Sequence, residues 1–146
     1  MASIALTWKP AGTWHHVGFV VASISETAPQ MALLLDSEWD GSIILDPIQN
    51  ARVSFLRGKH ASDPLFELVE PEGKDSPVGK FLERGGGLHH LCYEVANLEQ
   101  QLQNSRSTGA LVVRQPAPAV AFGGRRIAWV FTKTKLLIEY LEASRG

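Results

Sequence analysis

Hydrophobic and polar positions follow the same order twice along the chain. Residues 16–26, HVGFVVASISE, and residues 90–100, HLCYEVANLEQ, both begin at a histidine and continue as runs rich in Val, Phe and Tyr, which predicts a strand in each. A helical stretch, a glycine with a β-branched run and two further strands follow in each half. Each half of the chain therefore predicts a βαβββ unit.

Local signals place the helices and strands within each unit. We expect Ser25 to cap a helix over residues 26–39, and Asn97 with Gln100 to form a capping box for a helix over 98–107. The next two strands of each half are expected at residues 41–45 and 52–56, and at 109–113 and 126–130.

Two separate segments give nearly the same repeat distance. His90 follows His16 by 74 residues, and Glu139 in IEYLEA follows Glu67 in FELVEP by 72 residues. Such agreement indicates a tandem repeat. We predict an α+β fold in which one domain, 1–146, contains a module 14–72, a linker helix within 73–87 and a module 88–143. Ser76 as N-cap and Pro77 at the first helical position would begin that linker helix, and three glycines would end it.

Composition and charge exclude several classes of function. The 146 residues are 45% hydrophobic and 20% charged, which is typical of a globular protein. Fourteen Lys and Arg residues against fifteen Asp and Glu residues leave a formal charge of −1, so the chain offers no strong positive field for nucleic acid or an anionic membrane. A small-molecule partner fits this composition better.

Cysteine use and the N-terminus predict a cytoplasmic protein. The single cysteine, Cys92, excludes an internal disulfide and a cysteine-based zinc cluster, and is consistent with a reducing compartment. Residues 1–10 contain Lys9 and Pro10 before a signal-peptide core can form, and no apolar run approaches the length of a membrane span.

The recurring residues also form a candidate metal site. His16 and His90 begin the first strand of each module, and Glu67 and Glu139 lie in the last strand. Taken singly, each histidine is more typical of a strand edge, and each glutamate of a solvent-facing position. Their recurrence in register favours convergence on one divalent ion, and two nitrogen with two oxygen ligands admit Co, Mn, Ni, Fe or Zn.

Four segments resemble a known family. GGGLHHLCYEV, DSPVGKFLERGGG, FELVEP and LLIEYLE are similar to the methylmalonyl-CoA epimerases of the vicinal oxygen chelate superfamily, which also includes glyoxalase I and bleomycin-resistance proteins. The resemblance implies the glyoxalase-like fold, a homodimer, and metal ligands at His16, Glu67, His90 and Glu139. The preceding residues, His15 and His89, are expected on the opposite sheet face, because neighbours on a strand alternate.

The resemblance also implies an activity. A metal-dependent epimerase or isomerase would abstract an α-proton from a carbonyl substrate, for which an acyl-CoA is one candidate. Val53 stands where some epimerases carry an acidic residue, so Glu139 or Glu67 would serve as the base. We expect Gln49 to contact the substrate, and a basic cluster that includes Arg126 and Lys133 to meet CoA phosphates.

Two alternatives use the same fold. A glyoxalase-I-like lyase would use the same metal for a different carbonyl compound. A protein that sequesters an antibiotic would bind it between the modules, but such relatives generally lack the four metal ligands.

Overall fold

The computed structural model describes residues 12–144, so the N-terminal segment in which we expect no signal peptide lies outside the described residues. The first half contains β1 (Gly12–Val20), α1 (Ile24–Leu34), β2 (Glu38–Trp39), β3 (Ile44–Asp46), β4 (Ala51–Arg57) and β5 (Leu65–Pro71). After α2 (Gly79–Glu83), the second half contains β6 (Gly87–Val95), α3 (Leu98–Ser107), β7 (Leu111–Pro118), the short 3₁₀ helix η1 (Val120–Phe122), β8 (Arg126–Phe131) and β9 (Leu137–Glu142).

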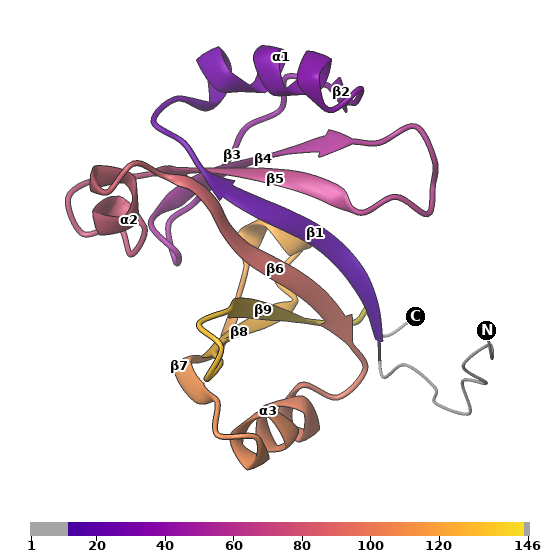
Figure 1. Ribbon diagram of the computed structural model, residues 1–146, viewed down its shortest axis with the longest axis vertical. Helices are drawn as coiled ribbons and strands as arrows, with labels where there is room; N and C mark the ends of the chain where they lie inside the picture. Colours follow the sequence, from indigo (N-terminus) through magenta and orange to yellow (C-terminus); the bar gives the residue numbers. More distant parts are fainter. Residues whose placement is uncertain (1–11, 145–146) are drawn as a thin grey trace.

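The strands form one continuous sheet in which the two halves join side by side. Its order is β2-β4-β5-β1-β6-β9-β8-β7, and β3 pairs with β4. β1 and β6 are antiparallel neighbours in the middle, and each has a parallel strand, β5 or β9, on its outer side. β1 and β6, the first strands of the two modules, therefore lie side by side where the two halves join (Figure 1).

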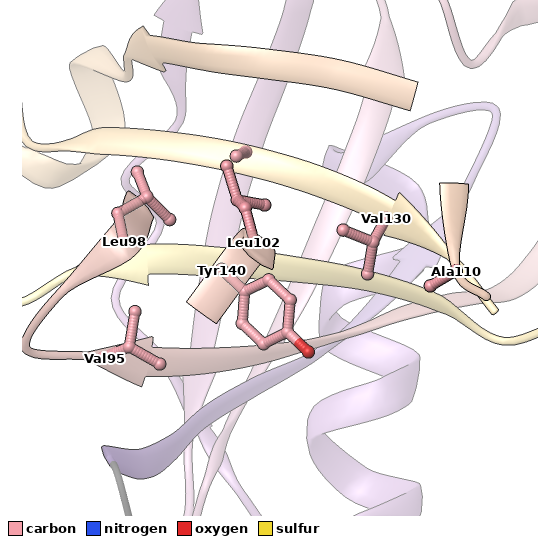
Figure 2. Packing of buried hydrophobic residues seen from close by; sticks show 7 residues of the cluster. Val95, Leu98, Leu102, Ala110, Val130 and Tyr140 are labelled. Carbon is pink, nitrogen blue, oxygen red and sulfur yellow. The ribbon is translucent and has the colours of Figure 1, made fainter. Parts of the chain in front are cut away.

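Each module packs its own helix against its own strands. Ile24 and Ala28 of α1 are buried with Leu56 of β4 and Leu68 of β5. In the second module, α3 contributes to the larger cluster shown in Figure 2, whose buried members are Val95, Leu98, Leu102, Ala110, Ala128, Val130 and Tyr140. Because α1 and α3 cover one face of the sheet, the residues that alternate with these core positions face the interior between the two halves.

The predicted α+β fold with two repeated units is confirmed, and so is the start of α3. Asn97 Oδ1 accepts the Gln100 N–H at 3.0 Å, so Asn97 is the N-cap. The capping box itself does not form, because the Gln100 side chain donates to Asn104 Oδ1 at 2.9 Å instead of bonding back to Asn97. The predicted cap of α1 is wrong. Ser23 takes that position, because its Oγ accepts the Glu26 N–H at 3.3 Å and the helix begins at Ile24.

Two further elements differ from their predicted bounds. The Gly79 N–H donates to Ser76 O at 3.1 Å in a tight turn, so α2 begins at Gly79 and Ser76 is not its N-cap. The strand expected at 41–45 begins only at Ile44, since Gly41 has a φ of 84° and the Ser42 N–H donates to Asp40 Oδ1 at 2.8 Å. Within residues 12–144, no helix has the length and hydrophobicity needed to cross a membrane.

Candidate metal centre

The four predicted metal ligands lie together at the middle of the sheet. His16 comes from β1 and His90 from β6, while Glu67 and Glu139 come from β5 and β9, the parallel neighbours of those strands. Their exposed fractions are only 0%, 2%, 4% and 3%, respectively. The fold therefore brings all four side chains into one buried cluster, as the repeat in the sequence predicts.

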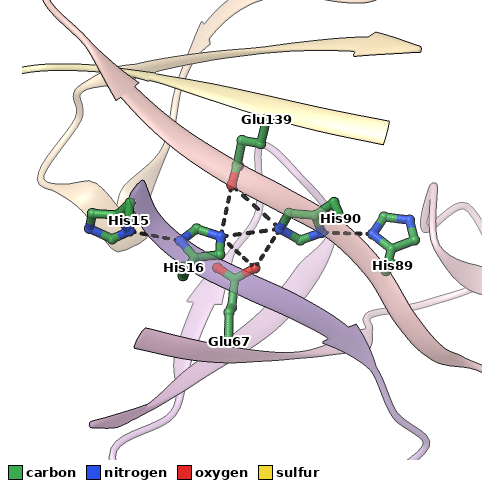
Figure 3. Close-up of polar contacts among 6 residues, drawn as sticks. All are labelled: His15, His16, Glu67, His89, His90 and Glu139. Carbon is green, nitrogen blue, oxygen red and sulfur yellow. Dashed lines mark hydrogen bonds and ion pairs between the residues drawn. The ribbon is translucent and has the colours of Figure 1, made fainter. Parts of the chain in front are cut away.

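The donor atoms of these side chains nearly touch. His16 Nε2 lies 3.1 Å from His90 Nε2, 3.0 Å from Glu139 Oε1 and 3.4 Å from Glu67 Oε1. His90 Nε2 lies 3.2 Å from Glu67 Oε1 and 3.5 Å from Glu139 Oε1. Figure 3 shows the two imidazoles between the carboxylates, with one oxygen of each carboxylate directed between them.

This arrangement fits a divalent ion. Bonds of about 2.1 Å to one ion place neighbouring donors roughly 3.0 Å apart at right angles and about 3.4 Å apart at tetrahedral angles. The observed separations of 3.0 to 3.5 Å cover that range. Glu139 Oε1 is buried and lies 3.0 Å from His16 Nε2, but among the described residues it accepts no hydrogen bond of acceptable geometry. A buried oxygen without a hydrogen bond is costly unless something else, such as a metal ion, satisfies it.

The four groups also control one another's protonation. Burial lowers the pKa of His16 and His90, but the two carboxylates outweigh it, so the pKa of His90 is raised and that of His16 is raised well above 6.5. Burial raises the pKa of Glu67 and Glu139, but the histidines outweigh it and both pKa values fall below 4.5. An ion that binds here must displace protons from the imidazoles, so its affinity should fall as the pH falls.

The expectation for His15 and His89 is wrong. The pairing of β1 with β6 shifts register between Trp14 and His16, and it shifts again opposite Gly18 and Phe19, where β6 has an extra residue. Each shift is a β-bulge, which cancels the usual alternation of side chains. His15 and His89 therefore lie beside the ligand histidines, at equivalent places in the two modules (Figure 3).

These two histidines form the next layer around the centre. His15 Nδ1 is 2.7 Å from His16 Nδ1, and His89 Nδ1 is 2.8 Å from His90 Nδ1. Burial, followed by the charge of the neighbouring ligand histidine, lowers the pKa of both, that of His89 to about 4. Both rings are therefore neutral near pH 7, and each has a ring nitrogen that can accept a hydrogen bond from the adjacent ligand histidine.

Aromatic rings and one glycine hold the ligand histidines in place. The Phe122 ring stacks on His16 with centroids 5.8 Å apart, and Trp129 meets His90 edge-on at 4.7 Å. Gly18 lies opposite His90, and a Cβ at that position would be 2.1 Å from His90 Cε1. Only glycine leaves room for the His90 ring.

A cavity of about 270 Å³ adjoins the centre. Glu67, His90 and Glu139 line it, together with His89. Most of its other walls are apolar and come from both modules and the linker: Ala51, Val53, Val69, Pro77, Val78, Val113, Ala119, Ala121, Phe122, Ile127, Trp129 and Leu137. A small molecule that enters this cavity reaches the metal ligands within a largely apolar environment.

The predicted substrate contacts separate into two groups. Gln49 lines the cavity, whereas Arg126 and Lys133 do not. Arg126 instead forms ion pairs with Glu99 and Glu142, and Lys133 lies beside Gly109. Their contacts with a substrate stay predictions.

The sequence interpretation missed Arg114, Trp129 and Phe122, which line the same cavity. The matching positions of Phe55 and Trp129 in the two modules were the available signal for an aromatic wall. No comparable feature of the sequence marks Arg114 as a residue of the cavity.

Comparisons with known proteins agree with this architecture. A sequence profile of the glyoxalase/bleomycin resistance protein/dioxygenase superfamily matches residues 15–129. An ethylmalonyl-CoA/methylmalonyl-CoA epimerase from Cereibacter sphaeroides is 28% identical over 124 residues, which cover 84% of this chain and 90% of the relative.

Two solved structures share the fold. Methylmalonyl-CoA epimerase from Mycobacterium tuberculosis has a TM-score of 0.80 at 23% identity, covering 96% of this chain and 94% of that one. A variant of the Streptomyces coelicolor methylmalonyl-CoA epimerase, in complex with 2-nitronate-propionyl-CoA, has a TM-score of 0.77 at 23% identity, covering 92% and 99%.

Proposed function

The chain belongs to the glyoxalase/bleomycin resistance protein/dioxygenase superfamily, and from that premise we propose that it is a metal-dependent epimerase or isomerase that removes an α-proton from an acyl-CoA. One observation carries the proposal. Four buried donor atoms from His16, Glu67, His90 and Glu139 lie within 4.8 Å of one another, and three of these residues line a cavity of small-molecule size.

His16, Glu67, His90 and Glu139 are the residues that would hold the ion. A divalent ion bound there would supply fixed positive charge to stabilise the negative charge that develops as the α-proton leaves. The two carboxylates offset the charge of the ion, and the neutral rings of His15 and His89 would fix the orientation of the ligand imidazoles through their Nδ1 contacts.

A carboxylate from the ligand set is the proposed base. Glu67 and Glu139 both line the cavity, and their lowered pKa values keep them deprotonated near pH 7. The two are equivalent candidates, because each carboxylate lies beside both ligand histidines at corresponding places in the two modules. The cavity's other carboxylate, Asp46, already accepts backbone N–H groups from Ile48, Gln49 and Val120.

The relatives favour the acyl-CoA substrate class. The Cereibacter relative is named for ethylmalonyl-CoA and methylmalonyl-CoA, and the Streptomyces structure holds 2-nitronate-propionyl-CoA. These relatives are epimerases by name, which favours epimerisation over the glyoxalase-like lyase.

Proton exchange in deuterated water tests the proposal. Metal-loaded protein should incorporate deuterium at the α-carbon of methylmalonyl-CoA, measured by mass spectrometry, and chelation should abolish the incorporation. As a control, adding metal back to the chelated protein should restore the incorporation, which shows that chelation did not damage the protein. Tight binding of the thioester without exchange would instead support a sequestering protein.

A further inference from the structure

Arg114 is a cation at the wall of an otherwise largely apolar cavity. It is the only Lys or Arg among the residues that line the cavity in the described chain. Its side chain is solvent-exposed, and within residues 12–144 it makes no hydrogen bond or ion pair. By contrast, Arg125 and Arg126 are both paired with glutamates.

Irregular strand pairing directs Arg114 toward the cavity. The register between β7 and β8 shifts between Val112 and Arg114, and again between Arg114 and Ala117. As a result the neighbours Val113 and Arg114 both line the cavity, which a regular strand would not allow. Bulges that change the direction of a side chain in this way are typical beside functional sites.

Arg114 also lies in register with the metal centre. It is the cross-strand partner of Trp129, which in turn is the partner of Glu139. Cross-strand partners share one face of a sheet, and strands are about 4.8 Å apart, so the Arg114 and Glu139 backbones are roughly 10 Å apart. The long arginine side chain can cross much of that distance.

We propose that Arg114 binds a carboxylate carried by the acyl part of the substrate and thereby selects carboxylate-bearing acyl compounds; this inference rests on the proposed function. The planar guanidinium can donate two parallel hydrogen bonds to a carboxylate. A CoA phosphate is the less suitable partner, because it lies at the far end of a long pantetheine arm, whereas Arg114 is only two strands from Glu139.

The test compares three ligands on metal-loaded protein by calorimetry: methylmalonyl-CoA, propionyl-CoA and free methylmalonate. Arg114→Met should weaken the binding of both carboxylate ligands by about 10- to 100-fold, the range for hydrogen bonds to charged groups. Propionyl-CoA, which has the same phosphates but no such carboxylate, should change less than twofold. Arg106→Gln, at an exposed site on α3, is the matched control and should change none of the three.

The outcomes separate this inference from the proposed function. Equal weakening of propionyl-CoA would assign Arg114 to a phosphate and overturn the inference, as would unchanged binding of all three ligands by a variant that still exchanges the α-proton. Arg114-dependent methylmalonate binding without proton exchange would support the inference and count against the proposed function. A wild-type protein that binds none of the ligands would overturn both.

Discussion

Glu139 has two proposed roles, as a metal ligand and as a base, and one substitution can separate them. Glu139→Gln keeps an oxygen that can still reach the ion but removes the basic carboxylate. We expect metal to remain bound while α-proton exchange falls by about 10²–10⁴-fold, the usual contribution of a general base. Deuterium incorporation by metal-loaded protein measures this, and Glu83→Gln, exposed on α2, is the control. Unchanged exchange would exclude Glu139 as the base.

The layer of histidines behind the ligands gives a second test at the residue scale. His89→Phe keeps a ring of similar size but removes the nitrogen that lies 2.8 Å from His90 Nδ1. Metal affinity, measured by competition with a chelator, should fall by about 10- to 100-fold, as for other groups that orient a metal ligand. The exposed His60 provides the control His60→Phe. Equal affinity in the His89 variant and wild-type protein would show that this contact does not orient His90.

The pairing of β1 with β6 explains which parts of the site could be predicted from sequence. The repeat of His16, Glu67, His90 and Glu139 marks equivalent positions, so the cluster is visible without a structure. The bulges at His15 and His89 are not, because the alternation rule assumes that neither strand contains an extra residue. The direction of the Arg114 side chain cannot be predicted for the same reason, because it depends on register shifts between β7 and β8.

How well a helix start can be predicted from sequence depends on whether other residues offer a competing signal. Asn97 caps α3 as expected because its signal is local and has no competitor. Ser23 and Ser25 both resemble caps, and only the hydrogen bond from Glu26 distinguishes them. The bounds of the two modules and the linker stay predictions.

Gly18 tests whether the close approach of β1 to β6 supports the centre. Gly18→Ala would place a methyl group against the His90 ring, so the ring must move away from the other ligands. Metal affinity and thermal stability should both fall. Gly79→Ala is the control, because a Cβ there meets no atom within 4 Å, and its stability should be unchanged or slightly higher. A Gly18→Ala protein with wild-type metal affinity would contradict the packing argument.

The buried charges predict how the stability of the whole molecule depends on pH after chelation of metal. The raised pKa values of His16 and His90 stabilise the fold fully below pH 6.5, and that contribution is lost as the pH rises through them. The lowered pKa values of His15 and His89 contribute above pH 6.5, and their contribution is lost as the pH falls. The lowered pKa values of Glu67 and Glu139 contribute above pH 4.5, and that contribution is lost as the pH falls further.

The free energy of unfolding of the chelated protein should therefore be greatest near pH 6.5 and decline on both sides. Bound metal should remove the decline on the alkaline side, because neutral imidazoles then hold the ion. Denaturant titrations from pH 4 to pH 9, with and without metal, measure this. A chelated protein whose stability increases steadily from pH 6.5 to pH 9 would contradict the charge assignment.

The proposed chemistry depends on one metal ion held between the two halves of the molecule. The most direct measurement is a titration of chelated protein with Co²⁺, followed by absorption and by competition with a chelator, in wild-type protein and in His90→Ala. We predict one ion per chain in wild-type protein and a sharply weaker affinity in the variant, because one of four ligands is missing. Equal affinity in the two proteins, or no ion bound by either, would contradict the metal centre.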